Sequence, residues 1–145
     1  MSVDEKFDLG RFVEAQDAVF ETAIAEIRRG KKRTHWMWYI FPQLRGLGRS
    51  EVARHYAIRS RAEAVAYAKH PLLSPRLRAC VTALQDLTSA NPVDVFGEVD
   101  SMKLGSSLTL FEAVSDDPLF SAALDRWLAG SRDEATLELL AAEAR

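Results

Sequence analysis

Two polar side chains, Lys103 and Ser107, lie among apolar residues at helical spacing and could hold an anion. On a helix over residues 100–114 the apolar residues fall on one arc at 100° per residue, and both polar residues lie inside it. A lysine there must extend to water, pair with a carboxylate or point into a polar cavity. Asp100, one turn earlier, favours a salt-bridged structural lysine. A lysine that neutralises a bound anion is the alternative.

Gln16 poses the same question in the first predicted helix, which we expect to run from an Asp8 N-cap to Arg29 and to stop at Gly30. Its amide lies on the apolar arc of that helix. A buried amide without partners costs roughly 1–3 kcal/mol, so Gln16 must be hydrogen-bonded to something specific. A structural amide that braces a loop is the favoured interpretation, and a ligand contact at the floor of a pocket is the alternative.

Arg45 begins a glycine-containing loop, residues 45–50, that leads into a predicted helix start at Ser50. Backbone N–H groups there, between Arg45 and Arg49, could hold a phosphate or carboxylate. Two glycines before a helix are more often a simple turn, and neither the phosphate-loop pattern nor the dinucleotide fingerprint is present. With two residues of the preceding aromatic segment, the candidate ligand-binding residues are Gln16, His35, Gln43, Arg45, Lys103 and Ser107.

Other chemistry has little support in the sequence. The three histidines are isolated, without an i, i+4 pair, so we expect no metal site and no cofactor. The nucleophile-elbow pattern is absent. Cys80 is the single cysteine, which excludes an internal disulfide, and it lies on the apolar side of its helix. We expect it to be a core thiol.

Charge is distributed unevenly along the chain. Residues 28–61 hold ten Lys or Arg and one acidic residue, a balance of +9, while the rest of the chain carries −11. Such a basic stretch is either a solvated face or a surface that attracts an anionic ligand or an acidic partner. A pI near 5.9 makes nucleic-acid binding the weakest of these functions.

The start of the chain is acidic, with Asp4 and Glu5, and has no apolar run typical of a signal peptide. The longest uncharged apolar run, residues 34–44, is far shorter than the roughly 20 residues of a membrane helix. We therefore expect a cytoplasmic protein that does not contact a membrane.

Helix signals predict a mainly α fold, a single domain over residues 1–145 with about seven helices. The start signals after the first helix are Ser50, the capping box Ser60–Glu63, Ser74-Pro75 for a helix to Thr88, Asn91-Pro92 for a short turn ending at Gly97, Asp100, Asp117-Pro118 for a helix to Gly130, and a second capping box Ser131–Glu134. The exception is residues 34–44, which are apolar on every side. We expect a buried irregular segment there, with Trp36 and Trp38 mostly buried.

Four segments of the chain resemble a known family: residues 12–16, 32–50, 67–73 and 100–111. The chain resembles domain-of-unknown-function family 1810, some of whose bacterial and fungal members carry the label "calpastatin". The resemblance implies a mainly α fold and supplies no catalytic residue or cofactor. The label does not transfer, because a disordered inhibitor would lack the apolar patterning seen here.

Three functions from different classes remain. The first is a pocket protein, potentially an enzyme, in which the six candidate residues converge on a small phosphate- or carboxylate-bearing ligand. The second is an interaction module whose basic stretch docks an acidic protein. The third, nucleic-acid binding beside the aromatic segment, ranks last. We favour the pocket because Gln16, Lys103 and Ser107 cost stability on apolar faces, which a flat docking surface would not require.

Overall fold

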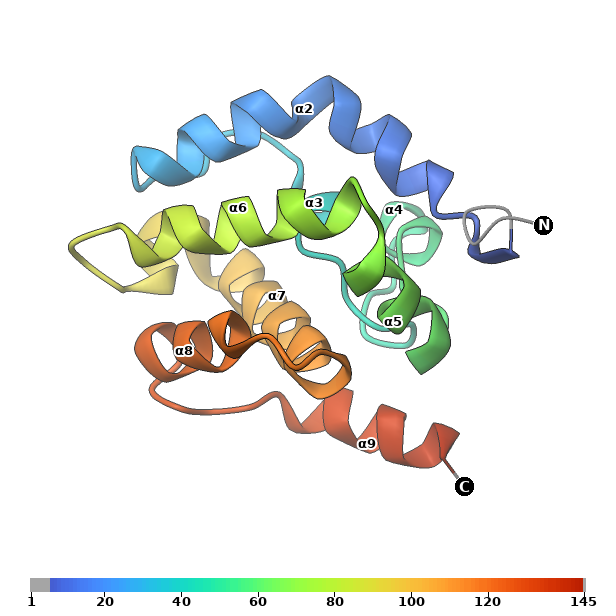
Figure 1. Cartoon of the computed structure of the whole chain (residues 1–145). Coiled ribbons are helices and arrows are strands. Elements are labelled where there is room, and N and C mark those ends of the chain that lie inside the picture. The colour runs from blue at the N-terminus through green and yellow to red at the C-terminus, as the bar shows by residue number, and fades with distance from the viewer. Residues whose placement is uncertain (1–5, 145) are drawn as a thin grey trace.

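The computed structural model describes residues 6–144 and confirms a mainly α fold (Figure 1). Its named helices are α2 (Gly10–Arg28), α3 (Met37–Ile40), α4 (Glu51–His55), α5 (Arg61–Lys69), α6 (Leu73–Gln85), α7 (Pro92–Val114), α8 (Pro118–Trp127) and α9 (Glu134–Glu143). In this range the strand-like pairing is a single parallel bridge between Leu44 and Ile58. Asp4 and Glu5, which entered the signal-peptide argument, lie outside the described residues. No helix in residues 6–144 is both long and apolar enough to cross a bilayer.

Several helix starts are capped as the sequence predicts. The Ser60 hydroxyl accepts from the Glu63 N–H at 3.0 Å, and the Asp117 carboxylate accepts from the Leu119 N–H at 3.0 Å. Ser50 caps α4 in the same way. Each cap satisfies a backbone donor that the first helical turn leaves free. Glu63 does not complete a reciprocal capping box, because its carboxylate is used elsewhere.

Four other predicted starts are wrong. Helix α2 begins at Gly10 without a side-chain cap, and Asp8 lies in the left-handed region at φ +53°. Helix α6 begins at Leu73, because the His70 Nδ1 atom accepts from the Leu72 and Leu73 N–H groups, both at 3.1 Å. An imidazole that accepts two backbone N–H groups takes the place of the predicted serine.

The third correction concerns α9. Asp133 caps this helix, accepting from the Thr136 N–H at 3.1 Å and from its hydroxyl at 2.6 Å. Asp133 also accepts from the Ser106 hydroxyl at 3.1 Å, which connects the cap to α7. The predicted Ser131–Glu134 capping box therefore does not form.

Helix α7 combines what the sequence divides into two elements. Asn91 caps its start, and Gly97 kinks it at φ 82° and ψ 170°, a conformation open essentially to glycine alone. The helix continues beyond the kink to Val114. Asp100 therefore lies inside the helix rather than at its N-cap, and its carboxylate is available for side-chain contacts.

Buried residues from every long helix form one hydrophobic core. Figure 1 shows α2 and α6 side by side, with α7 and α8 on the other side of α6 and α9 beyond them. Aromatic rings connect these layers: Tyr67 of α5 contacts Phe12 of α2 and Phe111 of α7, both with centroids 5.2 Å apart. Cys80 of α6 is fully buried, as predicted, and burial raises the pKa of its thiol to about 12 against the opposing charge of Arg28.

The aromatic segment agrees only in part with the prediction. Trp36 is fully buried and its ring contacts Phe96, whereas Trp38 is half-buried. Residues 37–40 form the single helical turn α3, and the rest of the segment is irregular. Thr34 and His35 are exposed, so the predicted burial begins at Trp36, and beyond it Trp38, Tyr39 and Gln43 are only partly buried.

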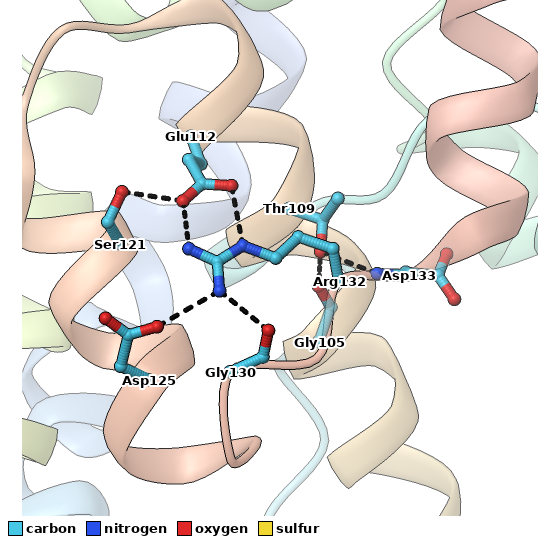
Figure 2. A network of polar contacts seen from close by, with 8 residues as sticks. All are labelled: Gly105, Thr109, Glu112, Ser121, Asp125, Gly130, Arg132 and Asp133. Carbon is cyan, nitrogen blue, oxygen red and sulfur yellow. Dashed lines mark hydrogen bonds and ion pairs between the residues drawn. The ribbon is translucent and has the colours of Figure 1, made fainter.

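A polar network fastens the loop before α9 to α7 and α8 (Figure 2). The Arg132 guanidinium forms a bidentate pair with Glu112 and also contacts Asp125 at 3.1 Å. Ser121 donates to Glu112 at 2.6 Å. The Arg132 hydrogen bonds hold the pKa of Glu112 below its usual range, and those of Glu112 raise the pKa of Arg132. Since the carboxylates and the guanidinium satisfy one another, this network explains the position of α9 and not a reaction.

Candidate functional site

The loop after α2 is held by one buried carboxylate. Glu26 accepts from the Arg33 N–H at 2.7 Å, from the Thr34 N–H and hydroxyl, and from the Trp36 indole N–H at 2.9 Å. Burial of the carboxylate would raise its pKa, but these hydrogen bonds outweigh burial and lower it to about 2. Glu26 thereby fixes Trp36 and turns Lys32 toward α7.

Lys32 and Lys103 share one carboxylate on α7. The Asp100 Oδ2 atom lies 2.9 Å from the Lys32 Nζ atom, and its Oδ1 atom lies 3.4 Å from the Lys103 Nζ atom. The predicted Lys103–Asp100 pair is therefore confirmed, although Lys32 makes the shorter contact. Two positive charges compete for one negative charge.

Each ammonium group also lies over an indole ring. The Lys32 Nζ atom is 5.2 Å from the Trp36 ring centroid, and the Lys103 Nζ atom is 5.1 Å from the Trp38 ring centroid. Such cation–π contacts favour the charged form of a lysine that has lost part of its hydration. We call these five residues, Lys32, Trp36, Trp38, Asp100 and Lys103, the lysine–tryptophan cluster.

The cluster has an inner and an outer half. The side chain of Lys32 is 9% exposed and the Trp36 ring is fully buried. The Lys103 side chain is 20% exposed, and the Trp38 ring is half-buried. A ligand could reach the outer half without unfolding the chain, and there it would meet the ammonium group with the longer carboxylate contact.

Two exposed basic residues adjoin Lys32 in the chain, and one histidine adjoins the Trp38 ring. Lys31 and Arg33 are exposed and form no ion pair with the residues that the structure describes. The exposed His35 ring lies 6.4 Å from the Trp38 ring, so His35 and Lys103 are neighbours of the same indole. The structure thus brings together two of the six predicted site residues, His35 and Lys103.

Gln16 lies elsewhere, in the core. Its amide nitrogen donates to the Tyr39 carbonyl at 2.7 Å and to the Tyr67 hydroxyl at 2.9 Å, and its oxygen accepts from Arg76 at 3.5 Å. The expectation of specific hydrogen bonds is confirmed. These hydrogen bonds brace the aromatic segment against α2 and α5, in agreement with the favoured interpretation of Gln16 as a structural amide.

The structure places the other three predicted site residues, Ser107, Gln43 and Arg45, in three different environments. Ser107 is fully buried one turn beyond Lys103, and its hydroxyl has no hydrogen-bond partner among the described residues. Gln43 is half-buried, and its backbone carbonyl accepts from the Ile58 N–H at 2.8 Å. Arg45 is exposed beside α9. Ser50 caps the helix start that follows the glycine loop, so the chain itself occupies that donor.

Sequence reasoning missed three charged residues that the structure makes central. Lys32 was counted only within the basic stretch, and no helical spacing marks it, because residues 31–36 are not helical. Glu26 and Arg11 lie on the buried side of α2, where a charged residue must have partners. The Glu26 partners lie in the loop that directly follows α2, whereas the His55, Ala57 and Glu63 partners of Arg11 are far away in the sequence. In residues 6–144 no three His, Cys, Asp or Glu side chains cluster as metal ligands would.

Two comparisons place the chain among proteins of unknown function. The family model described as "Protein of unknown function (DUF1810)" matches residues 6–140. The crystal structure of the conserved hypothetical protein Rv1873 from Mycobacterium tuberculosis is 45% identical, with a TM-score of 0.92, and the match covers 94% of this chain and 98% of that one. No curated protein matches.

Proposed function

This chain belongs to the DUF1810 family, and we propose that it binds a small anionic ligand at the outer half of the lysine–tryptophan cluster. The observation that carries the proposal is the shared carboxylate: Asp100 lies against two ammonium groups. A partly desolvated cation that is held at 3.4 Å by a carboxylate already paired at 2.9 Å favours a second anion.

The charges around the cluster support the same polarity. Glu26 is negative beneath Trp36, but four donors satisfy its carboxylate. Lys31 and Arg33, which flank Lys32 in the chain, add two exposed positive charges. In this proposal an approaching phosphate or carboxylate meets the Lys103 ammonium group with the Trp38 ring beside it. These residues bind and orient an anion, and none of them forms a nucleophile–base pair.

The test replaces Lys103 by methionine, which keeps the side-chain length and removes the charge. The ligands are inorganic phosphate, pyrophosphate and citrate, and the readout is the NMR signals of the Trp36 and Trp38 indole N–H groups. We expect at least one of these anions to shift the Trp38 signal in the wild type and to raise the melting temperature as binding linkage requires. Both responses should vanish in Lys103→Met.

The matched control is Lys69→Met, which removes an exposed lysine on α5 and leaves the cluster intact. It should respond as the wild type does. If none of the three anions shifts the Trp38 signal, or if Lys69→Met loses the response to the same extent, the proposal is wrong.

A second candidate function is the docking of an acidic protein, and one observation favours it. Val99 and Met102 are 68% and 73% exposed, and they flank Asp100 on α7 beside the cluster. Exposed apolar side chains next to basic ones suit an acidic, amphipathic partner. Met102→Ser should weaken binding of a synthetic glutamate–leucine peptide while leaving the citrate response intact. Equal binding of the peptide by both proteins would reject this second candidate.

A further inference from the structure

A second pair of positive charges, Arg45 and Arg59, lies next to the bridge between Leu44 and Ile58. The Arg45 N–H donates to the Ile58 carbonyl at 2.7 Å, and the Ile58 N–H donates to the Gln43 carbonyl at 2.8 Å. Leu44 and Ile58 point into the core. The residues that follow the two bridged positions, Arg45 and Arg59, are both exposed to solvent.

The parallel bridge places these two arginines side by side. Both are exposed and line one groove, so their side chains share the same stretch of surface. Neither side chain forms an ion pair or hydrogen bond with a described residue. Two unpaired like charges in one groove repel each other, and an oxyanion between them would remove the repulsion.

Both arginines line a groove of about 300 Å³ against α9. Its other walls are Leu44, Leu139 and Ala142, which are apolar, and Glu143. The Glu143 carboxylate already accepts from the Arg61 N–H, with both oxygens at 3.0 Å. The groove is thus positive at one wall and apolar at its other sides, with one carboxylate directed to the start of α5.

We propose that this groove is a binding site for a small amphiphilic oxyanion, whose phosphate or carboxylate lies between Arg45 and Arg59 and whose apolar stem packs on Leu139 and Ala142. The groove does not include any residue of the lysine–tryptophan cluster, so the two sites are independent. Guanidinium groups recognise both headgroups in bidentate fashion, and the volume fits a ligand of metabolite size.

The test is calorimetric titration with hexyl phosphate, hexanoate and inorganic phosphate, with NMR amide shifts to locate the site. We expect one of the two amphiphiles to bind more tightly than inorganic phosphate and to shift the amides of residues 44–46, 58–60 and 139–143. Comparison of the two amphiphiles identifies the preferred headgroup. Arg45→Gln and Arg59→Gln should each weaken that binding about tenfold.

Two further variants sharpen the test. Glu143→Gln keeps an oxygen for the Arg61 N–H and removes the negative charge, so it should tighten binding. The matched control Arg54→Gln removes an exposed arginine outside the groove and should have no effect, and Lys103→Met should also bind normally. The proposal is overturned if neither amphiphile binds at millimolar concentration, or if Arg54→Gln weakens binding as much as Arg45→Gln does.

Discussion

Two ionic groups at opposite ends of α2 differ in how completely they are satisfied. At its N-terminal end Arg11 pairs with Glu63 at 2.6 Å, with side chains 3% and 1% exposed. The Arg11 guanidinium also donates to the carbonyls of Phe7, Asp8, His55 and Ala57, and Glu63 accepts from the Arg59 N–H. Beyond the C-terminal end, Lys32 and Lys103 share Asp100 as their carboxylate partner among residues 6–144.

The difference separates structural from functional charge. In the Arg11–Glu63 pair, donors and acceptors are matched, and the pair joins the start of α2 to the first turn of α5. A matched buried pair has no remaining capacity for a ligand. In the lysine–tryptophan cluster the cations exceed the carboxylates and one side is open to solvent. Excess charge at an accessible place is what a binding site needs, and burial alone does not identify it.

The largest expected effect comes from breaking the matched pair. Arg11→Met leaves the Glu63 carboxylate buried without its partner, so the free energy of unfolding should fall by about 3–5 kcal/mol. Lys103→Met leaves Asp100 paired with Lys32, and its change should stay within about 1 kcal/mol. Urea unfolding of both variants measures the contrast. Equal losses would show that the cluster is a structural pair like the other.

An intermediate effect concerns acid. The pKa of Glu26 is lowered from 4.5 to about 2 in the folded chain, so its ionised form stabilises the fold above pH 4.5. That contribution, on the order of 2–3 kcal/mol, is lost as the pH falls from about 4.5 toward 2. Glu26→Gln should be less stable at pH 7 and lose less stability on acidification. Chemical unfolding at several pH values measures the difference.

Glu112→Gln is the control for this prediction, because the pKa of Glu112 is lowered as well. The Trp36 indole N–H donates to Glu26, so its NMR signal should shift as Glu26 is protonated, and Glu112→Gln should leave this shift unchanged because Glu112 contacts Arg132 and Ser121 instead. A Glu26→Gln variant that loses stability with acid as steeply as the wild type would contradict the role assigned to this carboxylate.

The smallest expected effect is a difference in unfolding free energy between two variants of the cluster. Trp36→Ala removes a fully buried ring and should cost about 3–5 kcal/mol, whereas Trp38→Ala removes a half-buried ring and should cost about 2 kcal/mol less. Thermal and urea unfolding of the two variants give the difference. Equal costs would mean that the outer half of the cluster is as much a part of the core as the inner half.

Helix content was predictable because its signals are local. The caps at Ser60 and Asp117 depend on atoms two or three residues away, and they form as predicted. The failures depend on context: His70 replaces Ser74 as a cap, and Asp133 is preferred to Ser131 because it also contacts Ser106 of α7. Local preference cannot rank two possible caps when a distant residue decides between them.

The candidate site was predictable only where its partners are close in sequence. The Lys103–Asp100 pair, one helical turn apart, is confirmed. Lys32 joins that pair across 68 positions, a contact that no periodicity reveals. Gln16 shows the converse: an amide on an apolar arc signals specific partners, but the partners proved to be core groups of Tyr39 and Tyr67.

The buried Cys80 thiol can report how often the folded chain opens. A thiol reacts as the thiolate, and at neutral pH a group with a pKa of about 12 inside the core is almost entirely protonated as well as inaccessible. Alkylation must therefore wait until α6 separates from α2 and α8. With one cysteine in the whole chain, the rate of labelling counts these openings directly, without any introduced probe.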